Sequence, residues 1–215
     1  MSATFAIPEG LAPEIYPLAW LVGPWRGYGV LAYPGITEQP VIHEVTFDHD
    51  GGPYLRCTST MWTVDAERSS SVPNETSGAA GAALLHPGGV WASETSYWRV
   101  PPGQDAAATD GAAGTGEDTG ASGDASAGRP PRFDIEVLVA QPSGHVSVYV
   151  GQVRGPRIDL VSDAVVRTAS AAEVTAGSRM YGLVGGELMW VESLAAFGHE
   201  LQSYSSGRLS RQDQP

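Results

Sequence analysis

Histidines are the side chains of this sequence best suited to proton transfer or metal binding near neutral pH. Of the five histidines, His43 and His49 share one face of a predicted strand, because alternate residues of a strand point to the same side. At about 3.3 Å per residue, six positions separate them too far to bind one metal ion together. His86 and His145 lie elsewhere in the chain. We therefore expect exposed strand or turn histidines and no metal site.

Other catalytic arrangements have weaker support. The single cysteine, Cys57, excludes an internal disulfide and a multi-cysteine zinc site, and we expect it to be a small buried hydrophobic residue. No serine lies in a nucleophile elbow, and the glycine-rich segments lack the strand–glycine–helix context of a phosphate loop. Four tryptophans could either line a ligand cavity or fill the core: Trp62, Trp91, Trp98 and Trp190.

The composition limits the classes of partner. The chain has 215 residues, with 24 acidic against 12 basic side chains and a formal charge of −12. Such an acidic chain is a poor partner for nucleic acid or for an anionic membrane surface, since both require clustered positive charge. No apolar run approaches the ~18 residues of a membrane span, and the first residues lack the pattern of a signal peptide. We therefore predict a cytoplasmic protein that binds neither nucleic acid nor membrane.

Hydrophobic residues alternate with polar ones through most of the chain, which is the pattern of half-buried strands. Turn-forming Gly, Pro, Asn and Asp residues separate these segments. The pattern predicts an all-β fold, a ten-stranded antiparallel up-and-down barrel of the calycin or lipocalin kind. Short helical turns are expected at 17–22 and from Ser170, which begins a capping-box pattern. The expected strands are 26–33, 41–49, 54–64, 90–100, 133–140, 145–154, 157–166, 178–184, 187–197 and 201–211.

The predicted domain organisation is simple. Residues 1–16 form an irregular, proline-rich extension, and 17–212 form a single barrel domain. Two segments rich in Gly, Ala and Ser, near 66–83 and 103–128, cannot bury enough apolar surface to offset their conformational entropy. We predict that both are disordered surface inserts.

A G-x-W-x-G-x-G motif begins the first expected strand, with Gly23, Trp25, Gly27 and Gly29 at its fixed positions. The glycines allow a strand to bend sharply at a barrel corner. We expect Trp25 to close one end of the barrel.

With this motif, the chain resembles the nitrobindin family of small haem-binding β-barrels. The resemblance covers roughly 17–65, 84–102 and 130–212. The segments that carry it, in family order, are PLAWLVGPWRGYG at 17–29, YPGI at 33–36, EVTFDHDGGPYL at 44–55, SETSYWRV at 93–100, VLVAQPSGHVSVYVG at 137–151, RIDLVSDAVVRTASAAEV at 157–174 and LMWVESLAAFG at 188–198.

The resemblance implies a function and also a departure from it. Nitrobindins hold ferric haem b through one axial histidine on the last strand, and are credited with scavenging nitric oxide and isomerising peroxynitrite to nitrate. In an ungapped match the axial position falls on Tyr204. Three further positions expected near the haem carry small side chains: Gly35, Ala92 and Ala172.

Two residues are candidates to replace the axial histidine. His199 lies beside a turn, five positions before Tyr204, and in a regular strand an odd offset points to the opposite face. Tyr204 itself could ligate iron as a tyrosinate, which requires help in losing its proton, and Arg208 is the basic residue nearby in the same strand.

The sequence therefore predicts a nitrobindin-like barrel that has lost the haem-ligating histidine at the position of Tyr204. It favours a protein with no cofactor and no peroxynitrite isomerase activity, whose barrel binds another small apolar ligand. One alternative is a haem-binding enzyme of the family that uses Tyr204 or His199 as its iron ligand, and another is a structural or interaction protein whose barrel is filled. The oligomeric state is not predicted.

Overall fold

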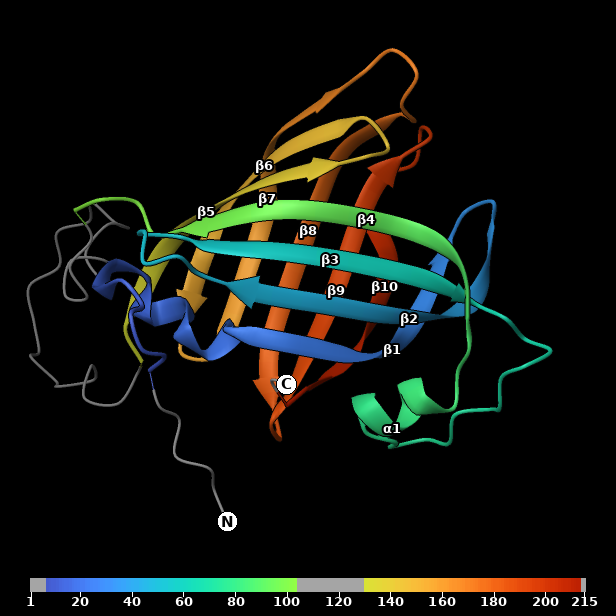
Figure 1. Cartoon of the computed structure of the whole chain (residues 1–215). Coiled ribbons are helices and arrows are strands. Elements are labelled where there is room, and N and C mark those ends of the chain that lie inside the picture. Colours follow the sequence, from blue (N-terminus) through green and yellow to red (C-terminus); the bar gives the residue numbers. More distant parts are fainter. Residues whose placement is uncertain (1–6, 104–129, 214–215) are drawn as a thin grey trace, which may run out of the picture.

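Ten antiparallel strands form a closed barrel in the computed structural model, which describes residues 7–103 and 130–213 (Figure 1). Each strand pairs with its neighbours in sequence, and β1 pairs with β10 to close the barrel. The predicted up-and-down barrel is confirmed. The strands are β1 (Gly23–Tyr33), β2 (Ile36–Asp48), β3 (Leu55–Val64), β4 (Pro87–Arg99), β5 (Arg132–Gln141), β6 (His145–Arg154), β7 (Arg157–Arg167), β8 (Val174–Val184), β9 (Glu187–Ala196) and β10 (Gln202–Arg211).

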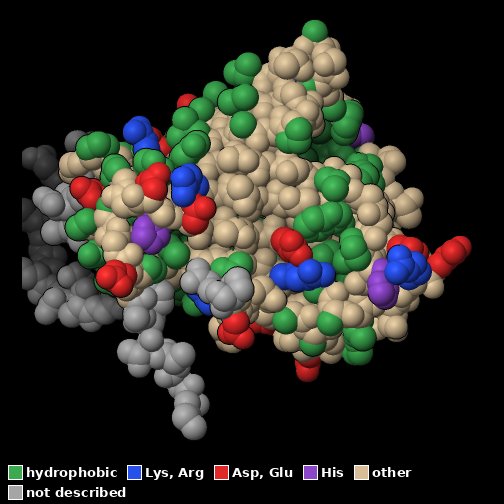
Figure 2. All heavy atoms as spheres, viewed as in Figure 1, with side chains coloured by type: hydrophobic (Ala, Val, Ile, Leu, Met, Phe, Trp, Pro, Cys, Tyr) green, Lys and Arg blue, Asp and Glu red, His purple; other side chains and the backbone are tan. Residues whose placement is uncertain are grey.

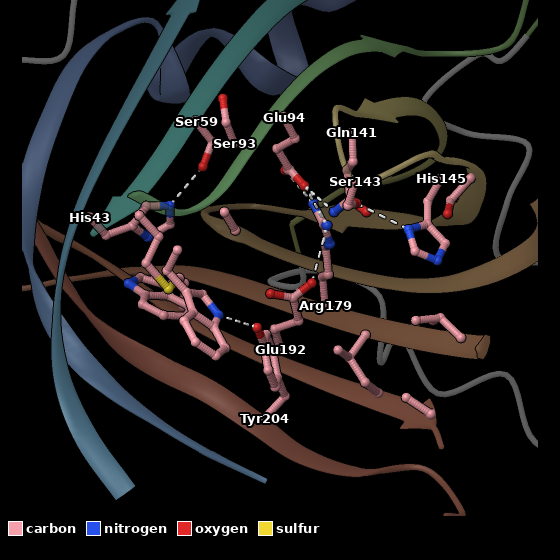
Figure 3. Close-up of a pocket in the computed structure, with 18 of the residues that line it drawn as sticks. His43, Ser59, Ser93, Glu94, Gln141, Ser143, His145, Arg179, Glu192 and Tyr204 are labelled. Carbon is pink, nitrogen blue, oxygen red and sulfur yellow. Dashed lines mark hydrogen bonds and ion pairs between the residues drawn. The ribbon is translucent and has the colours of Figure 1, made fainter. Parts of the chain in front are cut away.

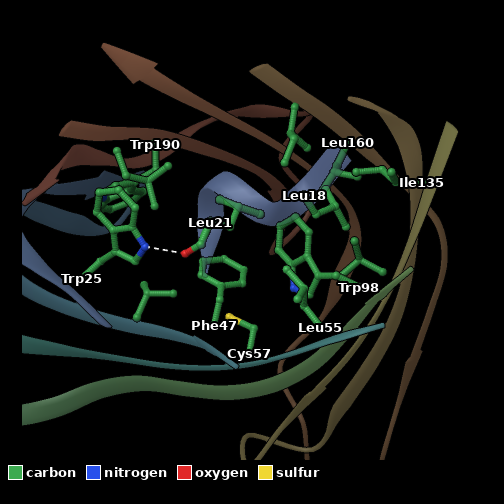
Figure 4. Packing of buried hydrophobic residues seen from close by; sticks show 14 of the residues in the cluster. Leu18, Leu21, Trp25, Phe47, Leu55, Cys57, Trp98, Ile135, Leu160 and Trp190 are labelled. Atoms are coloured by element: carbon green, nitrogen blue, oxygen red, sulfur yellow. Dashed lines mark hydrogen bonds between the residues drawn. The ribbon is translucent and has the colours of Figure 1, made fainter. Parts of the chain in front are cut away.

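One end of the barrel is filled by hydrophobic side chains and closed by a 3₁₀ helix, η1 (Pro13–Leu21). Leu18 and Leu21 of η1 are fully buried and point into the barrel (Figure 4). The indole Nε1 of Trp25 donates a 2.7 Å hydrogen bond to the Leu21 carbonyl, which fixes η1 to the first strand. The expected helical turn at 17–22 is therefore present, but it begins at Pro13, inside the segment predicted to be irregular.

The glycines of the sequence motif allow β1 and β10 to approach closely. A Cβ on Gly27 would lie 1.9 Å from the Arg208 carbonyl oxygen, and one on Gly29 would lie 2.2 Å from that of Ser206. Real Cβ atoms do not come this close, so only glycine is compatible with this pairing. Close contact between the backbones of β1 and β10 accounts for the glycines at these two positions, and the sharp bend that we expected stays a prediction.

The segment 66–83 is not the disordered insert that its composition suggested. It contains a short helix, α1 (Gly78–Ala83), which contacts β1 and β10 on the outside of the barrel (Figure 1). The backbone nitrogen of Gly78 donates to a carboxylate oxygen of Glu187 at 2.5 Å, and Gly81 lies against the ring of Tyr28. The small residues of α1 permit this close packing. The prediction of disorder took the same residues only as a sign that the segment has little apolar surface to bury.

Two other predictions concern loops. The capping-box pattern at Ser170 does not begin a helix, since residues 169–171 form a turn before β8. The predicted insert at 103–128 lies, apart from its first residue, outside the described residues.

The outer surface carries paired charges and scattered apolar residues. Neighbouring side chains of opposite sign are visible in Figure 2. Arg26 and Glu44 form one surface ion pair, with a 2.7 Å contact and both side chains about 40% exposed. Pairs this exposed contribute little to stability. Hydrophobic side chains lie over β5–β7 in the same view. In the described part of the chain, no helix is long and apolar enough to cross a membrane.

Candidate binding pocket

The other end of the barrel encloses a cavity of about 630 Å³. This volume lies within the range of small-molecule sites, about 300–1,000 Å³. Phe47, Cys57 and Tyr181 line its part nearest the hydrophobic core, while Tyr33 and Phe197 lie toward the open end. The cavity wall is mostly apolar, but charged and polar side chains also line it.

A buried arginine links the two walls of this cavity (Figure 3). Arg179 on β8 donates from its two terminal nitrogens to the carboxylate of Glu94 on β4, at 2.6 and 2.7 Å. One of those nitrogens also lies 3.1 Å from an oxygen of Glu192 on β9. The side chains of Arg179, Glu94 and Glu192 are only 5%, 14% and 18% exposed. The pocket therefore holds two carboxylates and one guanidinium.

Strand register explains how these residues meet. Arg179 and Glu192 are direct partners in the β8–β9 pairing, and Glu192 is the partner of Ser205 on β10. Glu94 comes from the opposite wall and is also bonded by the Gln141 amide at 3.2 Å. None of these residues was predicted from the sequence to lie in a site. The available signal was an acidic residue, Glu192, on the inward face of a strand that otherwise carries hydrophobic side chains such as Leu188 and Trp190.

The two carboxyl groups differ in their electrostatic surroundings. Burial raises the pKa of Glu192, and the nearby Arg179 offsets that effect only in part. Burial acts on Glu94 in the same direction, but its bidentate pair with Arg179 lowers the pKa below the ordinary value. For Arg179, burial would lower the pKa, yet the two carboxylates raise it well above the ordinary value. Glu94 and Arg179 are thus ionised, and of the two carboxyl groups Glu192 gains a proton more readily.

Two histidines that we expected to be exposed are buried in the wall of the cavity. His43 shares a 2.7 Å hydrogen bond with the Ser59 hydroxyl, and its ring packs edge-on against Trp190 at 4.8 Å. Burial lowers the pKa of His43 to about 4, so it is neutral at pH 7. His145 is bonded through Nε2 to the Ala172 carbonyl at 2.9 Å and through Nδ1 to Ser143 at 3.1 Å. The exposed-histidine prediction failed here because both residues lie on inward faces of their strands.

Tyr204 lines the cavity because β10 carries a bulge at this residue. Its hydroxyl accepts a 2.5 Å hydrogen bond from the indole Nε1 of Trp91, and its ring packs edge-on against Tyr33. Burial raises the pKa of Tyr204 to about 12, so the phenol is neutral at pH 7. Arg208 does not help to ionise it, because its guanidinium contacts Thr76 and Glu187 instead.

The remaining residues singled out from the sequence lie at different distances from the cavity. Ala92 and Ala172 line it, whereas Gly35 is in the β1–β2 turn and does not. His199 lies in the turn before β10, outside the cavity lining. The bulge at Tyr204 also means that strict alternation cannot relate the directions of His199 and Tyr204. Cys57 is buried, as expected, and burial raises the pKa of its thiol.

A closed antiparallel barrel with one packed end and one hollow end is the architecture of barrels that hold a small ligand. The family model described as "THAP4-like, heme-binding beta-barrel domain" matches residues 14–211, and the chain belongs to this family, the nitrobindin family. The resemblance inferred from the sequence is confirmed.

Similar proteins agree with this assignment. A protein of Beutenbergia cavernae named "Ferric nitrobindin-like protein" is 55% identical and aligns over 97% of this chain and 99% of its own length. A protein of Leifsonia xyli subsp. xyli named "Peroxynitrite isomerase" is 37% identical, over 95% and 98% of the two chains. The crystal structure of Rv2717c from M. tuberculosis superimposes with a TM-score of 0.65 at 28% identity, covering 94% of this chain and 99% of that one.

The donor atoms in the cavity can be compared with what a haem-binding barrel needs. All five histidines lie in the described ranges, and two of them, His43 and His145, line the cavity. Both nitrogens of His145 are hydrogen-bonded, and the Nδ1 of His43, which lacks a partner, is enclosed by protein atoms. The phenol of Tyr204 is neutral and bonded to Trp91. The two imidazoles are therefore not free to act as an axial ligand as they lie here, and Tyr204 would first have to lose its proton.

Proposed function

We propose that this chain is a nitrobindin-like barrel that does not bind haem through an axial histidine and lacks peroxynitrite isomerase activity. In place of haem, its cavity binds another small, largely apolar molecule. The observation that carries the proposal is Tyr204, a neutral phenol bonded to Trp91, at the position where the family resemblance expects the iron-ligating imidazole. The single unpaired cysteine, Cys57, is consistent with the cytoplasm as its compartment.

The rest of the cavity supports the same proposal. A tyrosinate ligand requires loss of the phenol proton, and a pKa of about 12 makes that loss unfavourable near neutral pH. The two histidines that line the cavity, His43 and His145, have ring nitrogens that are either hydrogen-bonded or enclosed by protein atoms. The names of the relatives also distinguish nitrobindin-like proteins from isomerases. The relative at 55% identity is named nitrobindin-like, and the one at 37% identity is named peroxynitrite isomerase.

A second candidate function is favoured by membership of the family itself. The family model describes a haem-binding domain, and a relative that spans the whole chain is named peroxynitrite isomerase. In this alternative, Tyr204 or His199 would hold the iron, and the hydrogen bond that Trp91 donates to the Tyr204 oxygen would favour the ionised form of that ligand.

A hemin titration distinguishes the two functions. We expect the purified protein to give no stoichiometric shift of the Soret absorption band. A shift that saturates at one hemin per chain, and that either Tyr204→Phe or His199→Ala abolishes, would overturn the proposal. As a matched control, His86→Ala removes an exposed histidine away from the cavity and is expected to behave as the unchanged protein.

A further inference from the structure

The charged groups inside the cavity do not balance. Among the described residues that line it, Glu94 and Glu192 contribute two carboxylates, and Arg179 contributes the one permanent cation. Glu94 takes two of the guanidinium's hydrogen bonds, at 2.6 and 2.7 Å. Glu192 has one 3.1 Å contact with Arg179, and its other oxygen is 3.4 Å from the Ser205 hydroxyl, at the long limit of a hydrogen bond. When both carboxyl groups are ionised, Glu192 therefore carries a negative charge that the pocket leaves uncompensated.

We propose that the pocket binds a small apolar molecule that carries one positive charge, an amine or a quaternary ammonium, with the charge placed at Glu192. This inference rests on the proposed function, because it fills the cavity with a ligand other than haem. The ligand's cation supplies the charge that Glu94 and Glu192 together lack, and its apolar part contacts the hydrophobic wall.

The aromatic side chains favour an organic cation over a metal ion. Tyr149 already accepts a cation–π contact from Arg179, with the guanidinium carbon 4.9 Å from the ring centre. Aromatic rings stabilise ammonium groups in this way, and they offer little to a hard metal ion. Within residues 7–103 and 130–213, no group of three His, Cys, Asp or Glu side chains is placed to hold a metal. A carboxylate ligand would face Glu94 and Glu192, while both terminal nitrogens of Arg179 are already occupied.

Proton linkage is a consequence of this arrangement. Without ligand, burial favours the protonated form of Glu192, and a bound cation favours the ionised form. Binding therefore releases a proton, and the affinity for a permanent cation decreases as the pH falls below the pKa of Glu192. The titratable and charged groups that face Glu192 belong to four other strands and are Glu94 on β4, Tyr149 on β6, Arg179 and Tyr181 on β8, and Tyr204 on β10.

The test uses three probes with one aromatic ring each: benzyltrimethylammonium, benzyl alcohol and phenylacetate. Binding to the full chain is measured by isothermal titration calorimetry. The first probe keeps its charge at every pH, so any pH dependence between pH 5 and 8 comes from the protein. We expect it to bind at least tenfold more tightly than the other two and to release a proton, seen as a dependence of the heat on the buffer's ionisation enthalpy.

Variants assign the effect to Glu192. Glu192→Gln keeps the shape of the side chain and removes its charge, and we expect at least a tenfold loss of affinity for benzyltrimethylammonium with no change for benzyl alcohol. Glu14→Gln removes one charge from the exposed surface of η1, at the closed end, and should leave all three affinities unchanged. If Glu192→Gln does not fold, the pH series on the unchanged protein still tests the proposal.

Each outcome decides between the hypotheses. Equal affinity for the three probes, preference for phenylacetate, or no binding of any probe would overturn the cation proposal. A one-to-one Soret shift with hemin, recorded on the same preparation, would instead overturn the proposed function. The two failures are therefore distinguishable.

Discussion

Arg179 on β8 and Glu94 on β4 lie on opposite walls of the barrel and are joined by two short hydrogen bonds, of 2.6 and 2.7 Å. The two strands are not neighbours in the sheet, so this pair crosses the interior of the barrel. This connection ties two opposite walls of the barrel together at its hollow end. It also holds Arg179 against Glu192, which determines the charge that the cavity presents to a ligand.

Arg179 is the residue on which this arrangement depends. Arg179→Met leaves two buried carboxylates without a cation, and removal of one partner from a buried pair costs about 3–5 kcal/mol. We expect the free energy of unfolding in urea to fall by this amount. Arg157→Met is the matched control, since Arg157 pairs with Asp159 on the surface with 61% of its side chain exposed. That change should cost at most about 1 kcal/mol. Equal effects of the two substitutions would contradict the central role of Arg179.

His43 makes stability dependent on pH in a known direction. Burial lowers its pKa from 6.5 to about 4, so between these values the unfolded chain binds a proton that the folded chain does not. Stability is therefore complete above about pH 6.5 and is lost as the pH falls toward 4, by about 3 kcal/mol in total. His43→Gln should flatten this part of the curve of unfolding free energy against pH.

Other buried groups also titrate in acid, so the difference between two variants isolates His43. His86→Gln removes an exposed histidine and should retain the dependence that His43 produces. If His43→Gln and His86→Gln gave superimposable curves between pH 4 and 6.5, the buried neutral state assigned to His43 would be wrong.

The glycine motif gives a prediction about stability. Gly27→Ala places a methyl group 1.9 Å from the Arg208 carbonyl, so β1 and β10 must separate at the seam that closes the barrel. Overpacking of this kind costs about 1–3 kcal/mol. Gly182→Ala in β8 is the control, because the nearest atom to its added Cβ is 3.9 Å away. Thermal unfolding should show a lower Tm for Gly27→Ala only, and an unchanged Tm for that variant would exclude the close approach.

The barrel could be predicted from the sequence because its signal is local. Alternation along β1 or β9 reports which side of each strand is buried, and turn residues mark where the strands end. The segment 66–83 was mispredicted for the opposite reason. Its order comes from contacts that α1 makes with β1, with β10 and with Glu187 at the start of β9, which is 109 residues away from Gly78. Composition does not record such contacts.

The site was harder to predict than the fold. The family resemblance identified Tyr204, but the side of β10 on which the Tyr204 side chain lies depends on a β-bulge. The bulge shifts the alternation of side chains by one residue, and it has no clear pattern in the sequence. The Arg179–Glu94 pair joins residues 85 positions apart. A charged residue on an inward strand face signals a buried partner, and only the closed topology identifies which residue that partner is.

Tyr204 allows a gain-of-function experiment. Tyr204→His places an imidazole on the β10 bulge, where the tyrosine ring now lines the cavity. A neutral imidazole ligates ferric iron without first losing a proton, whereas the phenol, with a pKa of about 12, does not. We expect a Soret shift with one equivalent of hemin that the unchanged protein lacks. Ser203→His adds the same group one residue earlier, on an exposed side chain, and should give no shift. A shift with both variants, or with neither, would contradict the assignment of Tyr204 to the axial position.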